Sequence, residues 1–281
     1  MIEVIAPGPY ATVQDLGRPG LAHLGVPRSG AADVHSLRLA NRLVGNREDA
    51  AGVEVTFGMA RLRFHGGAWV ALAGAPAAAR MGVPFWVPPG GELRLGAPEW
   101  GLRTYVAVRG GIAVEPVLGS RSTDSLSGLG PEPLRAGTLL PVGGAAVEEI
   151  SVDLAPPPGP GPAVLRVLAG PRDDWFAPGA LEALCGGPYV VSQDSNRVGV
   201  RLGGPELARA RKGELPSEGM VTGAVQVPPS GQPIVFLADH PPTGGYPVIA
   251  VVREADLPVA AQLRPGDEVR FSTRPTRRRR T

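Results

Sequence analysis

Polar side chains and glycines alternate along residues 217–246, and these residue types are better suited to chemistry than any others in the chain. The segment contains Ser217, Glu218, Gln226, Asp239, His240, Thr243, Gly244, Gly245 and Tyr246. Carboxylates and imidazole can transfer protons, whereas amide and hydroxyl groups can orient a small ligand. Glycines let backbone approach a ligand closely, although Gly244 and Gly245 could serve a tight turn alone. The segment predicts a site for a small amide or carboxylate.

A second polar segment lies near the start of the chain, between residues 12 and 46. Its polar residues include Gln14, Asp15, Arg18, Arg28, Ser29, Asp33, Asn41 and Arg42. Glycines among them permit turns whose N–H groups can cradle an anion. The segment is therefore a second candidate for ligand binding.

The pattern Q-D-x-x-R-x-G occurs twice, at residues 14–20 and 193–199. Four further pairs of similar segments follow the same order: 2–9 with 165–171, 27–30 with 216–219, 105–108 with 246–251, and 134–137 with 263–266. This collinearity predicts two copies of one small domain. A catalytic site seldom has to occur twice, so we interpret the pairs Asp15–Arg18 and Asp194–Arg197 as buried structural ion pairs.

Composition favours a chain of short strands joined by tight turns. Gly 40 and Pro 32 among 281 residues are abundant, yet hydrophobic residues make up 43%. Because glycine and proline favour turns and β-branched residues favour strands, we expect a mainly β fold of two tandem, duplicated β-barrel domains with a few short helices. The expected strands are Trp69–Ala73, Leu102–Val108, Ala163–Leu168, Ile234–Ala238 and Val248–Val252. Helices are expected at Asp33–Val44, capped by Asp33, and at Asp173–Leu184.

The proline-rich stretch 155–162 predicts the domain boundary. Such segments are stiff and extended and cannot join a sheet ladder. We expect a first domain over 1–154, a linker over 155–162, a second domain over 163–273 and an arginine-rich flexible tail over 274–281. The formal charge is +2, and removing the five arginines of that tail leaves 2 − 5 = −3, so the body of the chain is mildly acidic. Nucleic-acid binding is therefore not expected.

Several common chemistries lack their sequence signatures. The histidines His23, His35, His65 and His240 are not spaced as metal ligands, and no H-E-x-x-H or G-x-S-x-G motif occurs. We expect no metal site, and the first three histidines are expected at the surface or core edge. The single lysine, Lys212, belongs to neither a phosphate loop nor a biotin attachment motif. With one cysteine, Cys185, and neither a signal peptide nor a membrane-spanning stretch, the expected location is the cytoplasm.

The motifs together carry a family resemblance that covers nearly the whole chain. They are T-V-Q-D-L-G-R at 12–18, G-V-P-R-S-G-A-A-D at 25–33, A-N-R-L-V-G-N at 40–46, R-G-G-I at 109–112, L-G-S-R-S-T-D at 118–124, S-E-G-M at 217–220, G-A-V-Q-V-P-P-S-G-Q-P-I at 223–234 and T-G-G-Y-P at 243–247. The chain closely resembles the family of 5-oxoprolinase C subunits, also called the allophanate hydrolase subunit 2 or biotin-dependent carboxyltransferase family. Pro241 and Pro242 depart from the polar residues that are usual in this family before Thr243.

The resemblance implies two cyclophilin-like β domains in a bacterial cytoplasmic protein. It implies as partners the B and A subunits of 5-oxoprolinase, which are KipI-like and LamB/YcsF-like, with no nucleic acid and no membrane. Such complexes hydrolyse 5-oxoproline to glutamate with ATP, so ATP with Mg²⁺, bound with the partner subunits, is the expected cofactor. Relatives fused in urea amidolyases move a carboxyl group from carboxybiotin to urea.

Under the 5-oxoprolinase interpretation, Asp239 or Glu218 handles protons, and Gln226, Thr243 and Tyr246 hold the lactam or its carboxylate. The candidate catalytic residues are Asp239, Glu218, Gln226 and Tyr246, and the candidate substrate-binding residues are Ser217, Thr243, Gly244, Gly245, Arg28 and Ser29. Two alternatives remain open. One is carboxyl transfer to urea or a similar amide with biotin carried by another chain, and the other is a regulatory role in which the chain binds a partner.

Overall fold

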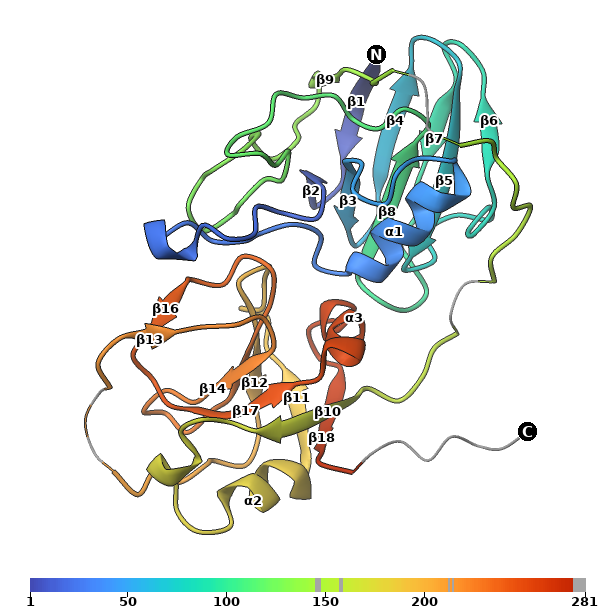
Figure 1. The fold of residues 1–281 in the computed structure, drawn as a ribbon. Coiled ribbons are helices and arrows are strands. Elements are labelled where there is room, and N and C mark those ends of the chain that lie inside the picture. The colour runs from blue at the N-terminus through green and yellow to red at the C-terminus, as the bar shows by residue number, and fades with distance from the viewer. Residues whose placement is uncertain (145–147, 157–158, 212, 214, 275–281) are drawn as a thin grey trace. The chain divides into compact units, whose positions relative to one another are not determined.

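The computed structural model describes residues 1–281 apart from 145–147, 157–158, 212, 214 and 275–281. The chain divides into two compact units, Met1–Pro160 and Gly161–Thr281, and each unit has its own apolar core. Strands dominate both units and helices are few and short, which confirms the predicted mainly β fold (Figure 1). Residues 157–158 of the predicted linker, and all but the first residue of the predicted tail, lie outside the described residues.

The first unit contains two antiparallel sheets and one α-helix. Its elements are β1 (Ile2–Pro7), β2 (Tyr10–Gln14), η1 (Ala22–Leu24), α1 (Val34–Leu43), β3 (Gly52–Thr56), β4 (Ala60–Phe64), β5 (Ala68–Gly74), β6 (Phe85–Val87), β7 (Glu92–Arg94), β8 (Arg103–Val108) and β9 (Leu139–Leu140). The sheets have the strand orders β7-β4-β1-β9 and β2-β3-β8-β5-β6. Apolar side chains of both sheets, such as Val4, Leu62 and Val106, share one buried cluster. This cluster is the core of the unit.

Helix α1 covers the second sheet by packing against β5 and β8. Leu37 and Leu43 lie in the same buried cluster as Ala71 and Ala107 of those strands. The carboxylate of Asp33 caps the helix, because its Oδ1 accepts a hydrogen bond from Ser36 N at 3.0 Å. The capped helix predicted at Asp33–Val44 is thereby confirmed.

A buried polar cluster joins the start of α1 to the sheet beneath it. The hydroxyl of Tyr105 donates to Glu54 Oε2 at 2.7 Å and accepts from Asp33 N at 2.8 Å. Glu54 Oε1 lies 3.5 Å from Arg103 Nε. Burial raises the pKa of the Tyr105 phenol well above its ordinary value. The phenol therefore stays protonated and fixes the strand-to-helix connection.

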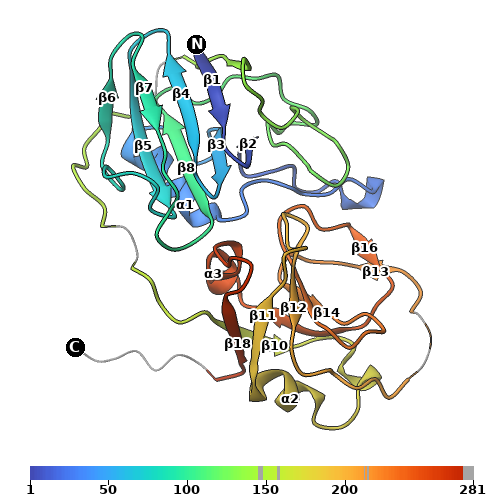
Figure 2. The same cartoon turned by 180° about the vertical axis from the view of Figure 1, so that it is seen from behind.

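The second unit is a closed β-barrel with an additional strand pair. Its elements are β10 (Val164–Ala169), η2 (Asp173–Trp175), α2 (Ala180–Gly186), β11 (Pro188–Val191), β12 (Gly199–Gly203), β13 (Glu218–Gly219), β14 (Ala224–Gln226), β15 (Ile234–Phe236), β16 (Thr243–Gly244), β17 (Val248–Val252), η3 (Glu254–Asp256), α3 (Leu257–Ala261) and β18 (Glu268–Ser272). The barrel order is β10-β17-β14-β15-β12-β11-β18, and parallel pairing of β10 with β18 closes it (Figure 2). Strands β13 and β16 pair separately.

One predicted helix differs from the structure. The segment 173–184 forms the short η2 and then α2, instead of one continuous helix. Pro178 and Gly179 separate the two, and Gly179 adopts a left-handed conformation with φ 82°. His23, His35 and His65 are exposed, as expected. Among the described residues, no helix has the length and apolar character needed to cross a membrane.

Candidate functional site

The β13–β16 pair brings the two ends of the polar segment 217–246 together. Glu218 lies opposite Gly244, and Gly219 lies opposite Thr243. Beyond the pair, Met220 N donates to the carbonyl oxygen of Pro242 at 2.8 Å. Ser217 and Thr243 are exposed at this surface. Residues that are far apart in the sequence therefore form one continuous surface on the second unit.

Gln226 lies buried beneath this pair at the end of β14, with only 5% of its surface exposed. Its Nε2 donates to the carbonyl oxygen of Tyr246 at 3.1 Å. A Cβ atom added at Gly244 would lie 2.8 Å from the same Nε2, so a side chain there would displace the amide. Gly244 thus permits the backbone of β16 to rest directly on the Gln226 amide, and the structure brings Gln226, Gly244 and Tyr246 together.

Glu218 is held by an arginine that carries no sequence motif and was not predicted. Arg172, just before η2, donates from Nε to the Glu218 Oε1 and Oε2 atoms at 2.9 and 3.0 Å, and its Nη2 also contacts Oε1. These hydrogen bonds lower the pKa of Glu218. The Glu218 carboxylate is therefore ionised and oriented, and it is a weak proton acceptor at neutral pH.

Arg209 is a second functional candidate that sequence reasoning missed. Its guanidinium lies over the ring of Tyr246, 5.8 Å from the ring centroid. Its Nη2 also donates to the carbonyl oxygen of Val227 at 3.0 Å. The cation thus lies over the ring of Tyr246, and Gln226 binds the backbone carbonyl of the same residue. The sequence does not indicate this contact, because only the strand topology of the folded unit brings Arg209 to Tyr246.

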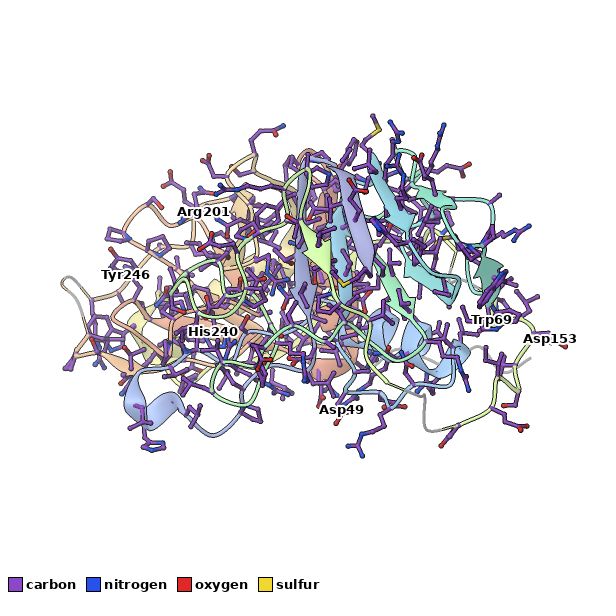
Figure 3. All side chains as sticks on the ribbon, turned by 90° about the horizontal axis from the view of Figure 1, so that it is seen from above. Asp49, Trp69, Asp153, Arg201, His240 and Tyr246 are labelled. Atoms are coloured by element: carbon purple, nitrogen blue, oxygen red, sulfur yellow. The ribbon has the colours of Figure 1, made fainter. Side chains whose placement is uncertain are left out.

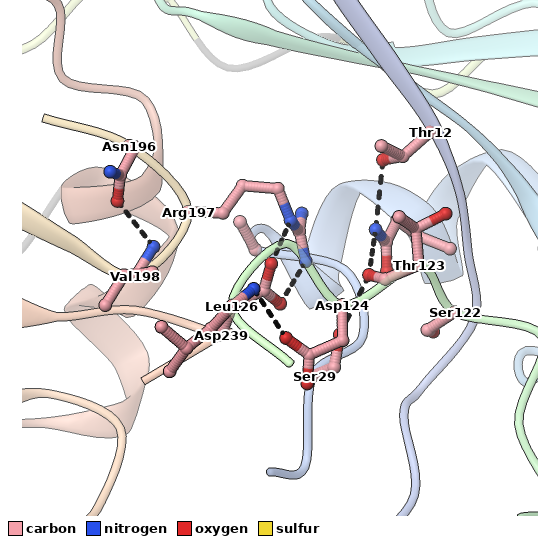
Figure 4. Close-up of polar contacts among 12 residues, drawn as sticks. Thr12, Ser29, Ser122, Thr123, Asp124, Leu126, Asn196, Arg197, Val198 and Asp239 are labelled. Atoms are coloured by element: carbon pink, nitrogen blue, oxygen red, sulfur yellow. Dashed lines mark hydrogen bonds and ion pairs between the residues drawn. The ribbon is translucent and has the colours of Figure 1, made fainter. Parts of the chain in front are cut away.

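Asp239 is completely buried and forms an ion pair with Arg197, itself 2% exposed. The Arg197 Nε and Nη2 atoms donate to the two carboxylate oxygens at 2.8 and 2.9 Å (Figure 4). The predicted pairing of Arg197 with Asp194 is therefore wrong, because Asp194 is exposed on the preceding turn. A planar guanidinium matches a carboxylate in this two-bond geometry, which fixes Asp239 firmly.

His240 follows Asp239 and is also buried, at 6% exposure. Its ring stacks on Phe236 with centroids 5.8 Å apart. His240 Nδ1 lies 2.8 Å from the carbonyl oxygen of Pro241, and because a carbonyl only accepts, Nδ1 carries the proton in this contact. His240 and Tyr246 both lie in the second unit, and Figure 3 labels them among its side chains.

In the first unit, the motif at residues 14–20 is held in place by the Asp15 carboxylate. This carboxylate accepts hydrogen bonds from the hydroxyls of Ser120 and Ser122, both at 2.6 Å, and from Arg121 N, also at 2.6 Å. Arg18 instead donates to the carbonyl oxygen of Ser122 at 2.7 Å. The predicted Asp15–Arg18 ion pair is therefore wrong, although both side chains are buried as expected.

The two binding candidates of the first unit differ in exposure. Arg28 is exposed, whereas Ser29 is buried and donates from Oγ to the carbonyl oxygen of Thr123 at 3.0 Å. Thr123 O also accepts from Gln14 Nε2 at 2.9 Å (Figure 4). Ser29 is one of few non-glycine residues with a left-handed backbone, at φ 54°. Strain of this kind is typical of sites where the surrounding structure fixes a backbone for a purpose.

A cavity of about 440 Å³ opens beside Asp15 in the first unit. It is lined by Asp15, Leu16, Gly17, Asn46, Arg47, Asp49, Ala50, Gly110, Gly119 and Arg121. Its charged side chains are two carboxylates and two guanidinium groups, so the lining is neutral overall. Asp15 was expected in a ligand-binding segment, but the contribution of residues 110–121 was not predicted.

The described residues show no cluster of metal ligands, and the N-terminus of α1 is not open to a phosphate. Within them, no group of three or more His, Cys, Asp or Glu side chains is arranged to hold a metal ion. Phosphates are commonly bound at a free helix N-terminus or by a loop lysine. The N-terminus of α1 is already occupied by the Asp33 carboxylate, and Lys212 lies outside the described residues.

Sequence comparisons with known proteins agree with one another. A family model described as "Carboxyltransferase domain, subdomain A and B" matches residues 24–273. The chain is 39% identical to the C subunit of 5-oxoprolinase from Escherichia coli, over 96% of this chain and 90% of that protein. It is 36% identical to the urea amidolyase of Lachancea kluyveri, over 96% of this chain but 17% of that protein.

The structural comparison agrees with these relatives. The crystal structure of TTHA0988 superimposes with a TM-score of 0.88 at 40% sequence identity. The match covers 96% of this chain and 55% of that chain, so the present chain spans about half of its length. The shared fold thus extends over nearly all of the present chain.

Proposed function

The chain belongs to the carboxyltransferase domain family, subdomains A and B, and we propose that it works as one component of an ATP-dependent 5-oxoprolinase. In this reaction the lactam of 5-oxo-L-proline is hydrolysed to L-glutamate together with partner subunits. The proposal draws on the identity of 39% to a protein named as the C subunit of 5-oxoprolinase, of which this chain covers 90%. That name implies a complex of several subunits.

The observation that carries the proposal is the buried Gln226 amide against the glycine backbone of β16. A lactam presents one N–H donor and one C=O acceptor side by side, and a glutamine amide presents the complementary pair. One Nε2 hydrogen of Gln226 is committed to the carbonyl oxygen of Tyr246, which fixes the orientation of the amide. The other Nε2 hydrogen lies toward Met220 Sδ, 4.0 Å from Nε2. In our proposal this weak contact is given up when substrate enters, and the hydrogen and Oε1 then face the lactam.

The charged groups around Gln226 orient the substrate in this proposal. Arg209 lies over Tyr246 and supplies positive charge for the carboxylate of 5-oxoproline. Asp239 and Glu218 are each held by an arginine, so they are proposed to act as fixed carboxylates that orient water or a donor group. ATP, when bound to the complex, activates the lactam carbonyl oxygen, and we propose that it binds with the partner subunits.

A coupled assay tests this function. The chain is purified with its cognate KipI-like and LamB/YcsF-like partners, 5-oxoproline and ATP are added, and glutamate and ADP are measured. Equal amounts of glutamate and ADP, formed only when all three proteins are present, are expected. An intact complex that forms no glutamate would contradict the proposal.

Carboxyl transfer is the second candidate function, and the urea amidolyase relative favours it. This chain would then supply the amide-binding half of a reaction in which carboxybiotin comes from another protein. The discriminating measurement repeats the assay with urea and a biotinylated carrier protein. Activity that avidin abolishes would favour carboxyl transfer, whereas avidin-insensitive glutamate formation would favour the 5-oxoprolinase.

A further inference from the structure

The cavity beside Asp15 is formed by four stretches of the first unit, none of which takes part in the proposed lactam site. Asp15 and Gly17 follow β2, residues 46–50 join α1 to β3, Gly110 follows β8, and residues 119–121 belong to the loop between β8 and β9. Its volume of about 440 Å³ is that of a site for a small molecule. The motifs at 12–18 and 118–124 thus meet at one cavity.

Two of the four charged side chains that line the cavity bind each other. Arg47 Nε donates to Asp49 Oδ1 at 3.0 Å, and Arg47 Nη2 donates to Asp49 Oδ2 at 2.8 Å. Both side chains belong to exposed residues. This pair uses both oxygens of Asp49 and one edge of the Arg47 guanidinium. Asp15 and Arg121 are therefore the charged groups of the lining that can receive a ligand.

The Arg121 guanidinium is fixed at one edge and open at another. The backbone N of Arg121 donates to Asp15 Oδ2 at 2.6 Å, and its Nε donates to the carbonyl oxygen of Val114 at 2.7 Å. The residue is half-buried and lines the cavity. Within the part of the chain that the structure describes, neither Nη1 nor Nη2 of Arg121 forms a hydrogen bond or an ion pair. The edge formed by these two atoms suits a carboxylate, which it binds through two parallel hydrogen bonds.

The Asp15 carboxylate offers an acceptor to the same cavity. Its Oδ1 accepts hydrogen bonds from Gly17 N at 2.8 Å and from the hydroxyls of Ser120 and Ser122, both at 2.6 Å. Among the described residues, Oδ2 accepts only the bond from Arg121 N. A carboxylate oxygen has two lone pairs, so Oδ2 can accept one more donor. Because Asp15 lines the cavity, a ligand bound there can supply that donor.

The second copy of the Q-D-x-x-R-x-G pattern shows that the fold does not require a buried aspartate at this position. Asp194 corresponds to Asp15 and is exposed on its turn. The second unit nevertheless forms a closed barrel. The burial of Asp15 against residues 120–122 is therefore particular to the first unit, and it places a fixed carboxylate beside Arg121.

We propose that this cavity binds a free α-amino acid. The α-carboxylate binds Nη1 and Nη2 of Arg121, and the α-ammonium group donates to Asp15 Oδ2. One fixed positive group and one fixed negative group match the two charges of a zwitterion, whereas a simple anion or a simple cation leaves one of them without a partner. The bond from Arg121 N to Asp15 Oδ2 keeps the two charged groups within one arginine side chain of each other.

Under the proposed function this amino acid is L-glutamate, and that assignment rests on the proposed function. The substrate 5-oxoproline has the same α-carboxylate, but its nitrogen belongs to the lactam and carries no positive charge. It therefore lacks the group that Asp15 binds. The cavity distinguishes the product of the reaction from its substrate, and it gives the first unit a product site of its own.

Calorimetric titration of the purified full-length chain with L-glutamate at neutral pH tests the proposal. We expect Arg121→Ala to weaken the binding about tenfold or more, because the variant loses charge-assisted hydrogen bonds to the α-carboxylate. Arg135→Ala is the matched control, since Arg135 is an exposed arginine of the same unit outside the cavity. Both Arg135→Ala and Gln226→Ala should bind L-glutamate like wild type. The unfolding temperature of Arg121→Ala shows whether the variant is folded.

Titrating the wild-type chain with altered ligands tests the contact with Asp15 without changing the protein. N-acetyl-L-glutamate keeps both carboxylates of L-glutamate but has no ammonium group, and 5-oxoproline also lacks this group. Both should bind the wild-type chain at least about tenfold more weakly than L-glutamate does. Equal affinity for L-glutamate and N-acetyl-L-glutamate would overturn the proposal.

Three further results would also overturn it. They are failure of the wild-type chain to bind L-glutamate, wild-type affinity in folded Arg121→Ala, and loss of binding in Gln226→Ala but not in Arg121→Ala, which would place L-glutamate at the lactam site. If L-glutamate binds as predicted but the complete complex forms no glutamate from 5-oxoproline and ATP, the proposed function alone is contradicted and the α-amino acid site stands.

Discussion

Arg197 holds Asp239 through two hydrogen bonds in a buried ion pair, although the two residues are 42 positions apart in the sequence. The pair joins the turn before β12 to the loop between β15 and β16, so it anchors the loop that leads into Thr243 and Gly244. Asp239 therefore has a structural role whatever it does in the reaction. A loss of activity in an Asp239 variant must therefore be distinguished from a loss of folding stability caused by the broken ion pair.

Asp239→Ala should destabilise the second unit by about 3–5 kcal/mol, because it removes the carboxylate that pairs with the buried Arg197 guanidinium. Urea denaturation of the purified chain measures this change. Asp194→Ala is the control, since that carboxylate is exposed on the turn and should change stability by less than about 0.5 kcal/mol. Equal stability of the two variants would show that the Arg197–Asp239 pair does not hold the loop.

Gly244→Ala should impair the site while leaving the barrel folded. The new methyl group would lie 2.8 Å from Gln226 Nε2, so the amide must move away from the carbonyl oxygen of Tyr246. We expect at least about tenfold lower kcat/KM for 5-oxoproline in the assembled complex, corresponding to about 1.4 kcal/mol. Gly219→Ala on the paired strand meets no atom within 4 Å and should retain activity. Comparable losses of kcat/KM in both variants would contradict the claim that the backbone of Gly244 must lie directly on the Gln226 amide.

Tyr105→Phe should destabilise the first unit by about 1–3 kcal/mol, because Asp33 N and Glu54 Oε2 each lose a buried hydrogen-bond partner. The folded-state pKa of Tyr105 is raised by burial, so its contribution is complete below the unfolded pKa of about 10 and is lost as pH rises above that value. Wild-type stability should therefore fall more steeply than that of Tyr105→Phe in alkaline solution. Parallel curves from denaturation at several pH values would contradict this assignment.

The Glu92 carboxylate should titrate far below other glutamates. Hydrogen bonds from Arg63 and then Arg61 lower its pKa from 4.5 to about 2. Because the folded-state pKa is depressed, the stability that Glu92 contributes is complete above pH 4.5 and is lost as pH falls toward 2. Carboxyl NMR titration should show this low midpoint, and high salt should raise it. A midpoint near 4.5 would mean that the arginine cluster does not form in solution.

Local structure could be predicted from the sequence better than long-range pairing. The strand expected at Val248–Val252 has those bounds in the structure, and Asp33 caps α1 as expected. Propensity and capping act within a few residues, so they can be read from a single sequence. The partners of Arg18 and Arg197 were predicted wrongly, because Arg18 binds the distant backbone carbonyl of Ser122 and Arg197 binds the distant carboxylate of Asp239.

The same distinction applies to the candidate site. The polar segment 217–246 contains Glu218, Gln226, Gly244 and Tyr246, and the structure brings these four together through β13–β16 and β14. Arg172 and Arg209 carry no motif and were not predicted. They enter the site only because η2 and the loop after β12 lie against it in the folded barrel. Contact between these residues and the substrate is a prediction.

The most direct test of the proposed lactam site compares Gln226→Ala with Gln232→Ala in the complete complex. Both variants remove a glutamine amide of the second unit, but Gln232 bonds the backbone of Gly204, whereas Gln226 lies beneath the β13–β16 pair. We predict that Gln226→Ala lowers kcat/KM for 5-oxoproline about 10- to 100-fold with the complex intact, and that Gln232→Ala retains wild-type kinetics. Wild-type kinetics in Gln226→Ala would contradict the placement of the lactam on this side chain.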